Sequence, residues 1–151
     1  METGQGIVEG IFIAASAAAP CEAVQSAEAK SGAGLVGDRY SVGEGTYSPR
    51  GGAGRHLTLV TELAGVAAGL APGESRRNIE TSGIDLLSLI GRRFAIGPVE
   101  CVGVRDCPPC AHLESLTADG VKDKLEGKGG LRADIISGGT INVGDTIRAI
   151  D

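Results

Sequence analysis

The chain has 151 residues, with 14 Lys and Arg against 19 Asp and Glu, which gives a formal net charge of -5 at pH 7. This length fits one hydrophobic core, so we expect residues 1–151 to form a single domain. The acidic balance argues against nucleic acid and membrane as partners, and a chain with no Trp, two Tyr and two Phe has too few aromatic rings for a base-stacking surface. Its 25 glycines predict many tight turns and bulges.

The N-terminal residues predict neither an export signal nor a membrane span. The apolar run over residues 11–20 is short, rich in Ala and without a basic flank. The start Met1-Glu2-Thr3 therefore favours a cytoplasmic protein. Four cysteines, three of them within residues 101–110, lack the spread spacing of a secreted disulfide framework, so we expect thiols with a chemical role or a metal.

In the first half of the chain, the pattern of apolar residues predicts two strands. Residues 6–13 alternate as an opening strand, whereas residues 14–30 are rich in Ala and give no assignable element. Residues 32–54 carry eight glycines, and an irregular segment of this length is typical of a functional site. Residues 56–60 alternate as a strand that leads into a helix over residues 61–70, capped by Thr61.

The second half predicts short strands with few helices. Residues 85–90 form a helical turn ended by Gly91, and residues 93–96 and 99–104 form strands around Gly97-Pro98. Prolines allow only a loop or a kinked helix entry at 107–110, and residues 113–125 support a short helix. The remaining expected strands are 135–136, 140–143 and 146–150, the last two meeting at a tight turn around Gly144-Asp145.

The spacing of these elements predicts the fold class. Strands recur at short intervals without a regular alternation of strand and helix. We therefore expect a mainly β fold with some α, a closed or nearly closed β-barrel with short peripheral helices, rather than a doubly wound sheet.

One segment matches a cofactor motif only formally. Residues 32–37 fit the dinucleotide fingerprint, but no buried strand precedes them and no helical pattern follows. We expect a glycine-rich surface turn here and no NAD site.

The clustered cysteines leave several readings open. Cys101, Cys107, Cys110 and His112 together could supply four zinc ligands, although Cys101 falls in a predicted strand and a second Cys-x-x-Cys pair is missing. A second interpretation is a thioredoxin-like dithiol, which would need a βαβ unit that is not evident. A third interpretation is that the thiols are buried and inert. The spacing thus disfavours zinc without deciding between the others.

Several cations lie in polar or glycine-rich surroundings. Arg76-Arg77-Asn78 combines two guanidinium groups with an amide, a set suited to phosphate or a similar oxyanion. Further cations are Arg39, Arg50, Lys128 and Arg132. Together they indicate a small anionic ligand in an otherwise acidic protein.

In chain order these motifs resemble those of the MOSC domain, named for the C-terminal domain of molybdenum cofactor sulfurase. The resemblance covers nearly the whole chain from about residue 7. The matching segments are Gly37-Asp38-Arg39-Tyr40, Arg55-His56-Leu57-Thr58-Leu59, Arg76-Arg77-Asn78-Ile79, Gly83-Ile84-Asp85-Leu86, residues 91–97, Cys107-Pro108-Pro109-Cys110, residues 128–133 and residues 139–145.

The resemblance implies a small stand-alone member with a barrel like that of the pyruvate kinase barrel domain. It also implies one reactive cysteine that carries sulfur as a persulfide or ligates molybdenum. Cys110 best matches this cysteine, and Cys107 matches an extra cysteine that could resolve or assist it. The family often has Gln at the position of His56.

The expected site places Cys110 at one mouth of the barrel, near cations that bind the phosphate of molybdopterin or lower the pKa of the thiol. The cofactor-binding residues we expect are Arg39, Arg76, Arg77, Asn78 and Arg132. Asp38 and Glu62 are candidates for orienting these arginines.

Three function classes follow. The first is a sulfur carrier or molybdenum-cofactor-binding domain, with sulfurtransferase-like chemistry and a pyridoxal-phosphate-dependent cysteine desulfurase or a molybdoenzyme as partner. The second is a molybdenum-dependent oxidoreductase component that reduces N-oxygenated compounds. Family members of this kind usually carry an added N-terminal barrel, so this chain would need partner proteins to complete the redox reaction. The third is a zinc-stabilised binding module without catalysis.

Overall fold

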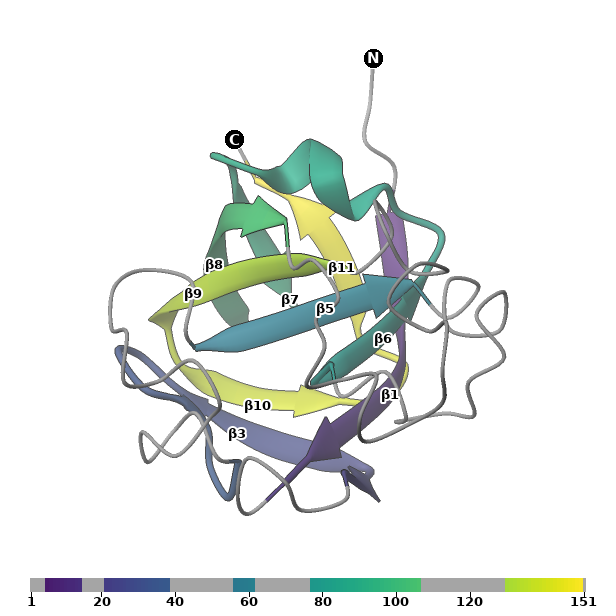
Figure 1. The fold of residues 1–151 in the computed structure, drawn as a ribbon, viewed down its shortest axis with the longest axis vertical. Coiled ribbons are helices and arrows are strands. Elements are labelled where there is room, and N and C mark those ends of the chain that lie inside the picture. The colour runs from purple at the N-terminus through teal and green to yellow at the C-terminus, as the bar shows by residue number, and fades with distance from the viewer. Residues whose placement is uncertain (1–4, 15–20, 39–55, 62–76, 107–129, 151) are drawn as a thin grey trace, which may run out of the picture.

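The computed structural model describes residues 5–14, 21–38, 56–61, 77–106 and 130–150. Within these residues the main sheet has the strands β1 (Gln5–Ile13), β2 (Glu22–Val24), β5 (Leu57–Thr61), β6 (Ile79–Ser82), β7 (Arg93–Ile96), β8 (Val99–Asp106), β9 (Leu131–Ser137) and β11 (Thr146–Ala149). They follow the order β11-β7-β8-β9-β5-β6-β1-β2, and β1 also pairs with β11. Seven of the described strands therefore close into a barrel, with β2 attached to β1 (Figure 1). The predicted β-barrel is confirmed.

A smaller sheet lies against one side of the barrel. It has the order β10-β3-β4, formed by β10 (Gly139–Asn142), β3 (Ser26–Lys30) and β4 (Gly34–Leu35) (Figure 1). The turn between β3 and β4 includes Gly32 at a φ of 76°. The glycine-rich surface turn expected over residues 32–37 is correct only at its start, because Gly34–Leu35 form β4 and Leu35 is buried. No helix within the described ranges is long and apolar enough to cross a membrane.

The barrel interior is filled by alternate residues of its strands. Leu57 and Leu59 on β5 and Leu131 and Ala133 on β9 belong to the buried apolar core, together with Phe94 on β7. Because neighbouring residues of a strand face opposite sides, the residues between these core positions point outward from the barrel. This alternation fixes which side chains of β5 and β9 lie on the outer surface.

Most of the expected elements within the described ranges are confirmed. The strands expected at 6–13, 56–60, 93–96 and 99–104 are β1, β5, β7 and β8, and the expected turn at 85–90 contains the 3-10 helix η3 (Leu86–Leu89). This turn ends at Gly91, whose φ of 77° suits glycine. The helices expected at 61–70 and 113–125 lie outside the described residues.

The C-terminal strands differ from the expected arrangement. The tight turn is present, with Gly144 at a φ of 95° and the Asn142 N–H donating to Asp145 Oδ2 at 2.8 Å. The two strands nevertheless do not pair with each other, since β10 pairs with β3 and β11 pairs with β1 and β7. The turn residues donate hydrogen bonds to other segments, Val143 N–H to Gln25 O and Gly144 N–H to Val8 O, and so direct the strands into separate sheets.

Candidate functional site

Several polar side chains of the described residues are buried. Thr58 and Arg132 point outward from β5 and β9, yet only 3% and 5% of their surface is exposed. The two residues are direct partners in the antiparallel ladder, so their side chains share one face. We call the buried set Asp38, Thr58, Arg77, Asn78, Glu80 and Arg132 the polar band.

Asn78 joins three strands at the centre of the polar band. Its Oδ1 accepts hydrogen bonds from Thr58 N–H at 3.1 Å and from Thr58 Oγ1 at 3.2 Å, and its Nδ2 donates to Phe12 O at 3.2 Å. Its backbone N–H donates to Thr58 Oγ1 at 3.0 Å, and its O accepts from Phe12 N–H at 2.7 Å. The side chain therefore holds β5, the start of β6 and β1 together.

Asp38 extends the polar band beyond the end of β1. Its Oδ1 accepts a hydrogen bond from the Ala14 N–H at 3.0 Å, and its side chain is buried. Ala14 lies two residues after Phe12, which binds Asn78. Asp38, the residue before the predicted ligand Arg39, is thus connected to the centre of the band.

The charges of the polar band comprise both signs. Arg77 and Arg132 were predicted to bind an anion, and both are buried, as are the carboxylates Asp38 and Glu80 of the same set. Buried charges require partners because removal from water is costly. Arg105 is the ladder partner of Arg132 and is exposed, so it adds a further cation on the same outer face.

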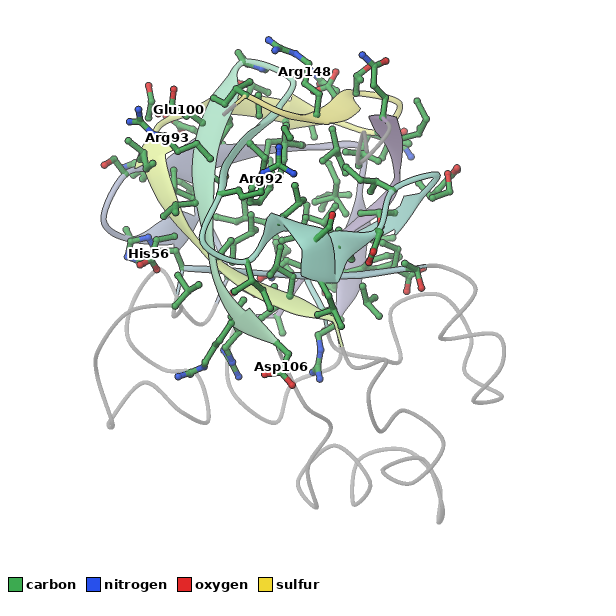
Figure 2. The ribbon with its side chains drawn as sticks, turned by 90° about the horizontal axis from the view of Figure 1, so that it is seen from above. His56, Arg92, Arg93, Glu100, Asp106 and Arg148 are labelled. Atoms are coloured by element: carbon green, nitrogen blue, oxygen red, sulfur yellow. The ribbon has the colours of Figure 1, made fainter. Side chains whose placement is uncertain are left out.

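The remaining predicted site residues, Cys107, Cys110, Arg39, Arg76 and Glu62, lie outside the described residues. Residues adjacent to them in the sequence are described by the structure. Asp106 ends β8 one residue before Cys107 and pairs with Leu131, the neighbour of Arg132. Figure 2 shows Asp106 on a different side of the barrel from Arg93, Glu100 and Arg148. The described residues next to Cys107, Arg39 and Arg76 thus belong to the polar band or pair beside it.

The family model of the MOSC domain matches residues 53–148. The chain belongs to the MOSC domain family. This family is associated with the molybdenum cofactor. The match includes the Cys-Pro-Pro-Cys segment and Thr58, Arg77, Asn78, Glu80 and Arg132.

Solved structures agree with this fold. YuaD of Bacillus subtilis is 18% identical with a TM-score of 0.79, and the match covers 99% of this chain and 98% of that one. YiiM of Geobacillus stearothermophilus is 11% identical with a TM-score of 0.74 over 97% of this chain and 75% of that one. YiiM of Escherichia coli is 14% identical with a TM-score of 0.68 over 96% and 70%. No curated protein matches the sequence significantly. At these identities the likeness shows the fold alone.

Cys101 of this MOSC domain lies in the barrel core. It is fully buried on β8, and burial, with smaller contributions from Glu100 and Asp134, raises the pKa of its thiol from 9.0 to about 12. Zinc binds thiolate, so this side chain is a poor member of the four-ligand set considered above. Within the described ranges no group of three His, Cys, Asp or Glu side chains could hold a metal ion.

The thiol of Cys101 is expected to be unreactive in the folded MOSC domain. Iodoacetamide at about pH 8 should leave Cys101 unmodified in native protein and alkylate it in urea, as read by peptide mass mapping. Between pH 9.0 and about 12 the folded state keeps a proton that the unfolded thiol has lost, so this group lowers the free energy of unfolding as pH rises through that window. A Cys101→Ala variant should lack this part of the pH dependence. Alkylation of native Cys101 at the rate seen in urea would contradict the assignment.

Sequence reasoning did not single out Thr58 and Glu80. Thr58 lies between two leucines, a pattern that indicates an ordinary solvent-facing position of a strand, and Glu80 lies in a mostly polar segment without alternation. Their burial follows from the tertiary structure, because an outward position on a barrel strand is covered only when other parts of the chain pack over it. The Arg55-His56-Leu57-Thr58-Leu59 motif was the one available signal for Thr58.

Proposed function

We propose that this MOSC domain is a sulfur carrier in molybdenum-cofactor chemistry and that Cys110 is the thiol that accepts the sulfur. The family membership over residues 53–148 is the observation that carries this proposal, because the matched range includes Cys107 and Cys110. The polar band supports it, since its Arg77 and Arg132 balance the carboxylates Asp38 and Glu80 and the exposed Arg105 adds a further cation opposite Arg132. A cationic setting favours a thiolate, the form of cysteine that attacks sulfur and binds soft metals.

The transfer step conserves atoms and electrons. The Cys110 thiolate attacks the terminal sulfur of a donor persulfide, such as the one formed on a pyridoxal-phosphate-dependent cysteine desulfurase. A new S–S bond forms on Cys110 while the S–S bond of the donor breaks, and the donor leaves as a thiolate. Cys107, three residues away in the sequence, would release the sulfur: its thiolate attacks the inner sulfur of the Cys110 persulfide, the Cys107–Cys110 disulfide forms, and the bond to the outer sulfur breaks so that this sulfur leaves as hydrosulfide.

The residues of the polar band fit an anionic cofactor in part. The guanidinium groups of Arg77 and Arg132, with Arg39 and Arg76, would hold the phosphate of molybdopterin, and Cys110 would be the thiolate ligand of molybdenum. When bound, the cofactor would supply two-electron redox chemistry at the metal. The Asn78 amide already binds Thr58 and Phe12, so we assign it the role of fixing the strands that carry the arginines.

The test is sulfur loading of two matched variants. Protein incubated with a cysteine desulfurase and cysteine should gain the mass of one sulfur atom by intact mass spectrometry. Cys107→Ser should retain this gain and Cys110→Ser should lose it, because only the accepting thiol is removed in the second variant. Unchanged loading of Cys110→Ser would refute the proposal. Stoichiometric molybdenum without added sulfur, measured by elemental analysis after expression in a cofactor-competent host, would instead favour a cofactor-binding oxidoreductase component.

A further inference from the structure

His56 lies at the junction of β5 and β9, next to the polar band. The ladder pairs Leu57 with Ala133 and Thr58 with Arg132, so His56 comes opposite Asp134 on the same outer face as Thr58 and Arg132. The side chains of His56 and Asp134 are each 22% exposed. The imidazole is therefore partly accessible to solvent and, by the ladder register, lies beside the segment of β9 that carries Arg132.

A backbone hydrogen bond fixes the protonation state of this imidazole. The Ile135 N–H donates to His56 Nδ1 at 2.9 Å, which requires an Nδ1 without a proton. The proton of the neutral ring is then on Nε2. The Asp134 Oδ1 is 3.5 Å from the same Nδ1, but an unprotonated nitrogen has no hydrogen to donate to that carboxylate. This contact is the one that a neutral ring makes, and it links His56 to β9 through the amide of Ile135.

Protonation would reverse these two contacts. A proton on Nδ1 turns that atom into a donor, so it can no longer accept from the Ile135 N–H, while the carboxylate of Asp134 becomes its natural partner. Of the charged residues on the neighbouring strands, β9 contributes Asp134 and Arg132, and β8 contributes Arg105 opposite Arg132. Glu100 pairs with Ser137 and binds Arg93, and Glu80 on β6 pairs with Val60, four residues farther along β5. Asp134 has the direct contact with the ring.

We propose that His56 is a pH-responsive positioning residue that links β5 to β9. The neutral imidazole binds the Ile135 amide, and the protonated imidazole releases it and pairs with Asp134. Arg132 is two residues before Asp134 on the same face of β9. The exchange of the Ile135 hydrogen bond for the Asp134 ion pair therefore changes how β5 holds the segment of β9 that positions Arg132. The inference is independent of the sulfur chemistry proposed for Cys110.

The test is nuclear magnetic resonance of the full chain from about pH 8 to about pH 5, the range in which histidine changes its charge. At the upper end the ring nitrogen shifts should show an unprotonated Nδ1. On protonation of His56, hydrogen exchange of the Ile135 amide should become about fivefold faster, relative to the Ile147 amide on β11, because one hydrogen bond is lost. A protonated Nδ1 at the upper end, or exchange that does not follow the charge of His56, would overturn the proposal.

Two variants separate the titration from a simple structural contact. His56→Gln offers an acceptor to Ile135 but gains no proton, so Ile135 should stay protected across the range relative to Ile147. His56→Ala should exchange rapidly at every pH, since the acceptor is gone. A pH-dependent step that persists in His56→Gln would show that another group is responsible and would overturn the proposal.

Discussion

A Gly130→Ala variant is expected to lose about 3 kcal/mol or more of its free energy of unfolding. Gly130 has a φ of 109°, a backbone region that side chains other than glycine rarely adopt. A Cβ at this position would also overlap the carbonyl oxygen of Leu59. That oxygen belongs to β5, which is paired on both sides, with β6 and with β9, so the backbone cannot move away easily. Urea unfolding followed by circular dichroism measures the loss.

The matched control is Gly32→Ala. Gly32 has a φ of 76°, and a Cβ there would meet nothing within 4 Å, so this variant has the conformational cost without the overlap. We expect a loss of about 1 kcal/mol for it. Equal losses of unfolding free energy for Gly130→Ala and Gly32→Ala would mean that the overlap with the Leu59 carbonyl oxygen does not contribute to the loss in Gly130→Ala.

An Asn78→Ala variant is expected to lose about 3 kcal/mol of its free energy of unfolding. The substitution removes the acceptor of the Thr58 N–H and the side-chain donor to Phe12 O, and these are buried groups that need hydrogen bonds. The loss should also appear locally, as faster hydrogen exchange of the Thr58 amide.

A surface hydrogen bond provides the comparison for Asn78. Ser82 Oγ donates to Glu9 Oε2 at 2.5 Å in an exposed position, and Ser82→Ala should change stability by no more than about 0.5 kcal/mol. Asn78→Asp keeps an acceptor for Thr58 but sets a buried carboxylate against the carbonyl oxygen of Phe12, so above about pH 6 it should be no more stable than Asn78→Ala. If Asn78→Ala were as stable as Ser82→Ala, Asn78 would not be the link between β1, β5 and β6.

The fold could be predicted from local patterns where a strand has one apolar face and a clear end. The strand β7 and the turn at Gly97-Pro98 are examples, because Phe94 and Ile96 are buried and Gly97 adopts a φ of 55°. The strand β6 could not be found in this way. Its Glu80 is buried on the outer face, and Thr81 is buried with its Oγ1 donating to Val60 O, so apolar and polar residues do not alternate.

The strands between residues 21 and 35 were missed for a related reason. The buried positions of β3 are the small Ala27 and Ala29, whose pairing with β10 depends on residues more than 100 positions away, and β4 has only two residues, Gly34 and the buried Leu35. A strand of this kind is stabilised by its partner rather than by its own sequence preference. The pairing of β10 and β11 with different strands could likewise not be predicted from the local sequence, because the residues between them have the pattern of a common tight turn.

Sequence patterns name residues of the candidate site but not their arrangement. The sequence indicated Arg77, Asn78 and Arg132 as polar groups of one site, and all three are buried in the polar band. Their connection runs through Thr58, which pairs with Arg132 and binds Asn78, and this register depends on contacts between distant segments. The roles of Cys110, Cys107, Arg39 and Arg76 stay predictions.

The most direct measurement of the central claim is to locate the transferred sulfur in the wild-type chain. After incubation with a cysteine desulfurase and cysteine, the persulfide is trapped by alkylation and the peptides are sequenced by tandem mass spectrometry. We predict that the added sulfur is on Cys110, with Cys101 unmodified. Sulfur found on Cys21, Cys101 or Cys107 instead, or no added sulfur at all, would contradict the proposed role of Cys110.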